Sequence, residues 1–342
     1  MTRFAFVAHL GTFEDIVYML HIPKFLIPLL RPILRIFPKL GGRLGFSVKD
    51  RFKIGGKDEA EGYIIIIWLT GEQVMAQPYK ARQRVLEAVL YAQNKLQCKI
   101  IGLGSLTSSV TDGGEWLSRR KEIKASLTHG DSYSVAVAIE GIKEIIAARK
   151  NHSEITLAIV GATGVIGKAI ARQVLPITKN LILIGRNSKK LEELKFLAEK
   201  SGDYPKITTS LDIEDINEAD IVVTATSWSK TVIQSCHLKE KAVIYEVSQP
   251  RNVPESILLK RPDIIVIDGA RVKVPDGIKF WWMNLFPHVT FACMSETMMQ
   301  ALEKDFNSHI GEIDPEFVKE TERRAKMYGF LHAPFTSFNK PL

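Results

Sequence analysis

The sequence predicts an α/β protein with a doubly wound parallel sheet, and three observations lead to this fold class. Short apolar runs alternate with helical patterns from residue 155 to about residue 270. A glycine-rich turn follows the first of these runs and leads directly into a helical pattern. The chain has 342 residues, which is too long for one ordinary domain and suits two. We therefore expect the doubly wound sheet to form one domain of two.

The first apolar run, residues 157–160, is short enough to be a strand that is buried on both faces. A strand, a glycine turn and a helix bring unpaired backbone N–H groups and the positive end of a helix dipole to one point. Glycine allows the backbone to close on a pyrophosphate there. The turn therefore predicts dinucleotide binding, although a glycine turn can also simply join a strand to a helix. The expected cofactor ligands in it are Gly161, Thr163, Gly164, Val165, Ile166 and Gly167.

Four further runs continue the predicted sheet, and a weaker one lies near Ile207. They are residues 181–184, 221–224, 243–245 and 264–267. Ligands bind such sheets at the carboxyl ends of the strands, so the loops that follow the strands are the candidate site. The loop at 225–229 accordingly adds Ala225, Thr226 and Ser227 to the expected cofactor ligands.

The loop after the second strand indicates which nicotinamide cofactor binds. NAD-binding domains usually carry an acid there, which holds the ribose hydroxyls. This chain has Arg186, Lys189 and Lys190 instead, and no acid before Glu192. An arginine can hold a 2′-phosphate by paired hydrogen bonds, whereas a carboxylate would repel it. We therefore expect NADPH in preference to NADH, while the two lysines are equally consistent with a solvated surface.

Before residue 155 the sequence predicts a second group of strands and helices. Strands are expected at residues 4–10, 46–48 and 63–69, and a strand that runs into a small-residue loop at 99–110. Helices are expected at residues 80–96, with Val85, Val89 and Leu96 on one face, and at 128–150.

The positive charge of the protein is concentrated near the N-terminus. The net charge is +8, and residues 1–57 carry +7 of it, with ten Lys or Arg and three acids. Within this region, residues 21–40 mix large apolar side chains with regularly spaced cations and four prolines, which prevent one continuous helix. Such a segment suits an interface or the mouth of an apolar cavity, and the basic region as a whole favours an acidic partner: a membrane surface, a nucleic acid or an acidic protein. A solvated basic face that covers the core is equally consistent with the pattern.

The three cysteines, Cys98, Cys236 and Cys293, predict neither a disulfide framework nor a zinc site, because they are odd in number and lack ligand spacing.

No signal peptide is recognisable, and no segment has the roughly 18 uninterrupted apolar residues of a spanning helix. We therefore expect a cytoplasmic protein.

After residue 270 the alternation of strands and helices ends. Residues 281–306 are rich in aromatic residues and methionine and then become a helical pattern, and Cys293 lies where this helix should start. A thiol at a helix N-terminus experiences the positive end of the dipole, which lowers its pKa and favours the thiolate. Cysteine is also a common small core residue, so position alone does not make Cys293 catalytic.

Several stretches together resemble one family, the long-chain acyl-[acyl-carrier-protein] reductases. They are FVAHLGTFED, GLGSLTS at 102–108, THGDSYSVA at 128–136, GATGVIG, FACMSETMM and KMYGF, spread in order over nearly the whole chain. The similarity is lowest at residues 17–75. The sequence THGDS also departs from the family pattern, because His129 and Asp131 stand where threonine and asparagine are expected around the glycine.

The resemblance implies NADPH-dependent reduction of a long-chain acyl thioester to a fatty aldehyde. Cys293 would be the nucleophile that carries the acyl group, and His9, His129 and His288 are candidate proton donors. The acyl donor would be acyl carrier protein or acyl-CoA; peripheral membrane association is compatible with this role, and nucleic acid is not an expected partner. Residues 1–150 would form a substrate domain, 151–270 an NADP-binding Rossmann domain, and 271–342 a helical segment that completes the substrate domain.

Two other classes of function remain consistent with the sequence. One is an NADPH-linked dehydrogenase of a small polar substrate, similar to shikimate dehydrogenases or glutamyl-tRNA reductases. It would require polar or cationic groups around Cys293, where the sequence has Phe291, Met294 and tryptophans. The other is a non-catalytic NADPH-binding or lipid-binding protein, in which replacing Cys293 would leave function intact.

Overall fold

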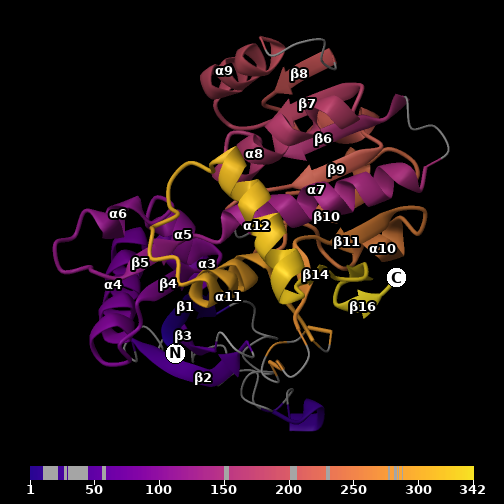
Figure 1. Ribbon diagram of the computed structural model, residues 1–342. Helices are drawn as coiled ribbons and strands as arrows, with labels where there is room; N and C mark the ends of the chain where they lie inside the picture. Colours follow the sequence, from indigo (N-terminus) through magenta and orange to yellow (C-terminus); the bar gives the residue numbers. More distant parts are fainter. Residues whose placement is uncertain are drawn as a thin grey trace. The chain divides into compact units, whose positions relative to one another are not determined.

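A computed structural model describes most of the chain (Figure 1). The described residues are 1–10, 22–26, 29, 45–55, 59–149, 154–200, 206–228, 232–275, 278–280, 283, 285–286 and 288–342. Most of the predicted interfacial segment at 21–40 lies outside them, as does much of the basic region at 1–57. Trp281, Trp282 and Ser229 also lie outside the described residues.

The chain forms two compact units. Unit 1 consists of Met1–Tyr133, Val272–Glu312 and Glu320–Leu331, and unit 2 consists of Ser134–Arg271, Ile313–Lys319 and His332–Leu342. These ranges differ from the division at residues 150 and 270, because helix α7 (Asp131–Ala147) starts in unit 1 and continues in unit 2. The division into a substrate domain and a cofactor domain stays a prediction.

Unit 2 contains a six-stranded sheet in which every neighbouring pair is parallel, in the order β11-β10-β9-β6-β7-β8 (Figure 1). Its strands are β6 (Thr156–Val160), β7 (Asn180–Ile184), β8 (Lys206–Ser210), β9 (Ile221–Thr224), β10 (Val243–Glu246) and β11 (Ile265–Asp268). Its helices include α8 (Val165–Val174), α9 (Ser188–Glu199) and α10 (Ile257–Lys260). The strand order reverses between β6 and β9, which is the doubly wound arrangement that binds dinucleotides. The predicted fold class is confirmed, and so is each predicted strand of this sheet.

Unit 1 contains a five-stranded sheet in the order β2-β3-β1-β4-β5, parallel except for β2. The strands are β1 (Thr2–Leu10), β2 (Phe46–Ile54), β3 (Ala60–Thr70), β4 (Ile100–Leu103) and β5 (Ser126–Thr128). One face packs on α4 (Pro78–Asn94), whose residues Val85 and Val89 are fully buried. Helix α4 ends at Asn94, so Leu96 lies beyond it and is only half-buried, contrary to the prediction.

Several short helices connect the strands of unit 1. They are α3 (Gly71–Ala76), α5 (Leu106–Val110) and α6 (Glu115–Ser118). The small-residue loop predicted at 99–110 is therefore partly wrong, because residues 106–110 are helical. The Thr107 hydroxyl donates hydrogen bonds to the carbonyl oxygens of Gly104, at 2.8 Å, and Val7, at 3.1 Å, and thereby fixes the start of α5 against β1.

The other face of this sheet packs on α11 (Ala292–Glu303). A Cβ at Gly102 would overlap the hydroxyl of Thr297 and lie 2.7 Å from the ring of Phe6, so α11 rests directly on β4. Gly102 follows Ile101, which faces α4, and therefore points to the opposite side of the sheet. Helix α11 thus takes its position from the sheet, which holds its first residues in place.

The segment 271–342 contains strands as well as the predicted helices. Helices α11 and α12 (Pro315–Tyr328) are accompanied by β12 (Arg271–Lys273), β13 (Val289–Phe291), β14 (Leu331–His332), β15 (Thr336–Ser337) and β16 (Lys340–Pro341). The prediction of a helical segment was incomplete, because strands of two or three residues leave no periodic pattern. Among the described residues, no helix has the length and apolar character to cross a membrane.

Candidate functional site

The glycine turn of unit 2 leaves room for a ligand next to the backbone. Gly161 has φ +91°, and a Cβ on it would lie 2.6 Å from the carbonyl oxygen of Ala225. A Cβ on Gly167 would overlap the Gly161 carbonyl group. Gly164 is the N-cap of α8 and has no side chain to cap the helix. The turn therefore fits a pyrophosphate, because the N-terminus of α8 presents its N–H groups there.

The predicted cofactor residues lie together at the carboxyl ends of three adjacent strands, β7, β6 and β9. The residues from Gly161 to Gly167 form the turn between β6 and α8, Arg186 follows β7, and Ala225, Thr226 and Ser227 follow β9. The amide of Ala225 donates to the carbonyl oxygen of Val160 at 2.8 Å, which holds this loop against β6. The structure brings these residues to one edge, and their individual roles stay predictions.

The loop after β9 is held by side chains from the loop after β10. The hydroxyl of Thr226 donates to Oδ1 of Asn252 at 2.6 Å, and the amide of Thr226 donates to Oγ of Ser248 at 2.9 Å. Asn252 in turn donates to the carbonyl oxygen of Trp228 at 2.9 Å. This network fixes the loop that faces the glycine turn.

A buried carboxyl group lies at the end of β10, below this network. Glu246 is fully buried, and its Oε1 accepts hydrogen bonds from the Thr224 hydroxyl, at 2.5 Å, and the Asn252 amide, at 3.2 Å. Its Oε2 has no hydrogen-bond partner among the described residues. Burial raises the pKa of Glu246 to about 7, so the group titrates near neutral pH.

Arg186 and Trp228 form a pair beside the glycine turn. The guanidinium carbon of Arg186 lies 5.4 Å from the centre of the Trp228 ring, and Trp228 is exposed. A cation over an aromatic face at this distance is favourable. Trp228 was not among the predicted site residues, although it directly follows Ser227 in a predicted cofactor loop. The predicted cofactor cations Lys189 and Lys190 are exposed in the first turn of α9.

Cys293 is the second residue of α11 and is half-buried. The N-cap is Phe291, whose side chain has no group that could cap the helix. Cys98 is buried, which raises the pKa of its thiol to about 12, and Cys236 is exposed in a 3₁₀ turn. Of the three cysteines, Cys293 alone is placed where an α-helix N-terminus can favour a thiolate.

A glycine turn also lies against Cys293. Gly130 has φ +71°, and a Cβ on it would lie 2.5 Å from both the Cβ and the carbonyl oxygen of Cys293. Helix α7 starts at the next residue, Asp131. The N-terminal ends of α7 and α11 therefore meet at Cys293, and only glycine fits between them.

Polar side chains are buried next to this contact. Glu296 accepts hydrogen bonds from the Thr128 hydroxyl, at 2.6 Å, and the Tyr133 amide, at 2.8 Å. The amide of Asp131 donates to Nδ1 of His129 at 3.0 Å, so the neutral ring carries its proton on Nε2. Thr128 and Glu296 were not predicted, although Glu296 lies one helical turn after Cys293.

Burial shifts the pKa of three groups in this cluster. It raises the pKa of Glu296 and lowers that of His129, because each loses solvation of its charged form. It also raises the pKa of Asp131 to about 7. The Asp131 side chain remains 16% exposed in the first turn of α7, where the helix dipole favours the ionised form and opposes this rise.

The three candidate proton donors lie at different places in unit 1. His129 directly precedes Gly130, the residue that packs against Cys293. His9 lies at the end of β1, with Nε2 3.1 Å from the Ser105 hydroxyl oxygen. His288 directly precedes β13 and has φ +60°. In the described part of the chain, no three His, Cys, Asp or Glu side chains come together as metal ligands.

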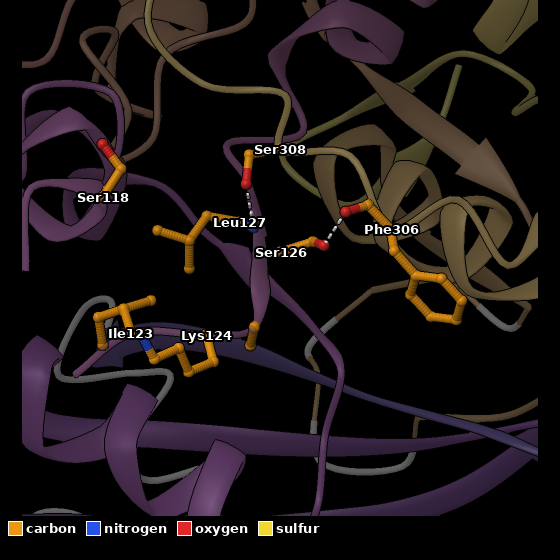
Figure 2. A pocket seen from close by; sticks show the side chains of 8 residues that line it. Ser118, Ile123, Lys124, Ser126, Leu127, Phe306 and Ser308 are labelled. Atoms are coloured by element: carbon orange, nitrogen blue, oxygen red, sulfur yellow. Dashed lines mark hydrogen bonds between the residues drawn. The ribbon is translucent and has the colours of Figure 1, made fainter. Parts of the chain in front are cut away.

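Figure 2 shows a hollow beside the first residues of β5, at the opposite end of α11 from Cys293. It is lined by Ser118, Ile123, Lys124, Ala125, Ser126, Leu127, Phe306 and Ser308. The Ser126 hydroxyl donates to the carbonyl oxygen of Phe306, and the Leu127 amide donates to the Ser308 hydroxyl oxygen at 3.1 Å. Both hydroxyl groups thus join β5 to the segment that follows α11, so the hollow is part of that structural contact.

Comparison with known proteins shows which family model matches part of unit 2. Residues 144–268 match the family model described as shikimate / quinate 5-dehydrogenase. With its parallel sheet and open glycine turn, this match identifies residues 144–268 as a nicotinamide-cofactor domain of the kind found in dehydrogenases and reductases.

Two curated proteins are similar over longer stretches. The aminotransferase PigE of Serratia sp. is 27% identical over 289 residues, which cover 82% of this chain and 33% of that protein. The chain thus spans about a third of the length of PigE. The long-chain acyl-[acyl-carrier-protein] reductase of Synechococcus elongatus is 27% identical over 250 residues, which cover 68% of this chain and 70% of that protein.

Two solved structures align with this chain at low TM-scores. L-Tryptophan dehydrogenase from Nostoc punctiforme aligns with a TM-score of 0.35 and 16% identity, over 78% of this chain and 69% of that chain. A dipicolinate synthase from Bacillus halodurans also aligns with a TM-score of 0.35, at 12% identity, over 50% of this chain and 58% of that chain.

Proposed function

We propose that the protein uses NADPH to reduce a long-chain acyl thioester to an aldehyde, with Cys293 as the nucleophile. The observation that carries this proposal is the place of Cys293 at the second position of α11, with the first residues of α7 against its backbone. The N-terminus of α11 favours the thiolate and also an oxyanion that forms beside it, while the turn before α7 holds Cys293 in place. The similarity to the Synechococcus reductase supports the choice of substrate.

Cys293 would act in two steps that leave it unchanged. Its thiolate attacks the thioester carbonyl carbon, a new C–S bond forms, and the donor thiol leaves and takes up a proton. Bound NADPH would supply the hydride that reduces the acyl carbon held on Cys293. The resulting thiohemiacetal then collapses: the C–S bond breaks, its electron pair returns to the sulfur, and the aldehyde is released. The proton that the donor thiol takes up would come from solvent, because burial lowers the pKa of His129 and favours its neutral ring.

Residues of unit 2 would hold the cofactor. The glycine turn and the N-terminus of α8 would bind the pyrophosphate, and Arg186 would bind the 2′-phosphate. Trp228 would offer its exposed ring face to the adenine, beside the guanidinium group of Arg186. The donor thiol would belong to acyl carrier protein or to coenzyme A, since both deliver acyl groups as thioesters.

A second candidate is an NADP-linked dehydrogenase of a small polar substrate. The shikimate / quinate dehydrogenase match over residues 144–268 favours it. So does the polar cluster of Thr128, His129, Asp131 and Glu296, because such an enzyme needs polar groups around Cys293. Against it, Glu296 and Thr128 are already bonded to each other and to backbone groups.

One assay separates the two candidates. The purified protein is given NADPH with long-chain acyl-CoA or acyl-[acyl carrier protein], and in parallel NADP⁺ with shikimate or quinate. We expect NADPH oxidation with one fatty aldehyde formed per NADPH, and loss of this activity in Cys293→Ser. Reduction of NADP⁺ by the small hydroxy acids, with acyl thioesters inert, would contradict the proposal and support the second candidate.

A further inference from the structure

We infer that Glu296 is a positioning residue that holds the turn of residues 128–131 against Cys293 by linking α11 to the start of α7. The inference concerns the geometry of Cys293, and the importance of that geometry for catalysis rests on the proposed function. The reactivity of the Cys293 thiol can be measured without any acyl substrate, so the inference and the proposed function can be contradicted separately.

Glu296 and Cys293 lie on the same face of α11, one turn apart. The Glu296 side chain is buried, with 1% of its surface exposed, and both carboxyl oxygens have partners. Oε1 accepts the hydroxyl of Thr128 at 2.6 Å, and Oε2 accepts the backbone amide of Tyr133 at 2.8 Å. A buried carboxyl group with both oxygens bonded therefore connects the two segments that supply its partners.

The bond from Tyr133 makes Glu296 a cap for another helix. Tyr133 is the third residue of α7, and the first N–H groups of a helix have no acceptor within the helix. A carboxylate at this position satisfies one such group and interacts favourably with the helix dipole. Glu296 therefore fixes the first turn of α7 relative to α11.

The bond from Thr128 fixes the turn before α7. The hydroxyl of Thr128 donates to Glu296 and accepts the amide of Gly130 at 3.1 Å. The amide of Gly130, the hydroxyl of Thr128 and the carboxyl group of Glu296 thus form one hydrogen-bonded chain. Because Gly130 is also in contact with Cys293, this chain determines how closely the turn approaches the nucleophile.

Both carboxyl oxygens of Glu296 are engaged in these bonds, which is why we assign it a positioning role and not a catalytic one. The titratable groups that interact with it are His129 and Asp131 on the turn, and His129 in turn interacts with His309 on the segment after α11. The amide of His129 donates to the carbonyl oxygen of His309 at 3.1 Å, which holds the other side of the turn. The carboxyl group of Glu296 thus joins the turn directly to the helix of Cys293, whereas His309 joins it to the segment beyond that helix.

The test measures the reactivity of Cys293 with iodoacetamide as a function of pH, in a Cys236→Ser background that removes the exposed thiol. Thr128→Val keeps the shape of the side chain and removes the hydroxyl, whereas Thr128→Ser keeps the hydroxyl. We expect Thr128→Val to change the alkylation rate about tenfold and to shift its pH midpoint, as loss of a hydrogen bond to a charged group implies. Thr128→Ser should stay within about twofold of the parent, because serine offers the same donor and acceptor.

The matched control is Thr224→Val in unit 2, which removes an equivalent hydroxyl from a buried glutamate, Glu246. It should lower the melting temperature to a similar extent and leave the alkylation of Cys293 unchanged. Should Thr128→Val not fold, Glu296→Gln replaces it. A glutamine amide has only one acceptor oxygen, so it cannot accept both the Thr128 hydroxyl and the Tyr133 amide as the two carboxyl oxygens do. Unchanged alkylation and an unchanged pH midpoint in the folded variant would overturn the inference and leave Glu296 with a purely structural role.

Discussion

The two glycine turns of this protein use the same local structure for opposite purposes. In unit 2, the turn between β6 and α8 packs on itself and on Ala225, so the N-terminus of α8 stays open to a ligand. In unit 1, the turn between β5 and α7 packs on Cys293, and Glu296 closes the N-terminus of α7. An open helix end can bind a charged group of a cofactor, whereas a closed one positions a protein residue.

The two buried glutamates differ in a corresponding way. Each accepts a hydrogen bond from a threonine hydroxyl, Thr224 to Glu246 and Thr128 to Glu296. Glu296 has partners on both oxygens, whereas Oε2 of Glu246 has none among the described residues. We therefore expect Glu296 to control geometry and Glu246 to contribute to how stability depends on pH, together with the other buried carboxyl groups whose pKa is raised.

The largest effects are expected from alanine at the two turns. Gly167→Ala should weaken NADPH binding about 100-fold or more, because the new Cβ overlaps the Gly161 carbonyl group. Gly130→Ala should reduce acylation of Cys293 to a similar degree, because its Cβ meets Cys293 and its backbone has positive φ. NADPH fluorescence titration and mass spectrometry of the acylated protein measure the two effects.

Each alanine variant is the control for the other. Gly130→Ala should retain NADPH binding, and Gly167→Ala should retain acylation. If either variant lost both properties while remaining folded, the two turns would not serve separate purposes.

A smaller effect is expected from Arg186→Ala. If Arg186 holds the 2′-phosphate, NADPH binding should weaken by about 1.5–3 kcal/mol, the value for a hydrogen bond to a charged group, and NADH binding should change little. The dissociation constants of both cofactors provide the measurement. Lys189→Ala is the control, because it removes one exposed positive charge close to Arg186 in the sequence. An unchanged preference for NADPH in Arg186→Ala would remove the 2′-phosphate argument.

The smallest effect concerns Glu246 and pH. Because burial raises its pKa to about 7, the folded state holds a proton that the unfolded state releases above its ordinary pKa near 4.5. Between these values the unfolded state binds fewer protons, so stability falls as pH rises and then levels off above pH 7. Urea unfolding at pH 5 and pH 8 should show this loss, about 1–3 kcal/mol, in the parent and a clearly smaller one in Glu246→Gln. Equal pH dependence in the two proteins would show that Glu246 is not the group that titrates.

The sheet of unit 2 could be predicted from the sequence because its signals are local. Each strand is a short apolar run, and the turn after the first is marked by three glycines at a spacing of three residues, Gly161, Gly164 and Gly167. Helix α5 was missed because the hydroxyl of Thr107 helps to set its start by bonding to Val7, 100 residues away. The strands after residue 270 were missed because two or three residues show no period.

The candidate site, like the fold, was predictable only where its signals are local. The position of Cys293 at a helix start follows from the apolar pattern of α11. Its surroundings do not, because Thr128 and Glu296 are 168 residues apart, and nothing in the stretches THGDSYSVA and FACMSETMM indicates that these two side chains meet. Trp228 was missed because its contact with Arg186 depends on how β7 and β9 flank β6 in the sheet.

The most direct test of the central claim is to trap the acyl group on the protein. The protein is incubated with a long-chain acyl thioester in the absence of NADPH, digested, and examined by mass spectrometry. We predict an adduct on Cys293 alone, with Cys98 and Cys236 unmodified, and its discharge as aldehyde when NADPH is added. An adduct on Cys236, or aldehyde formation at full rate by Cys293→Ser, would contradict the claim that Cys293 carries the acyl group.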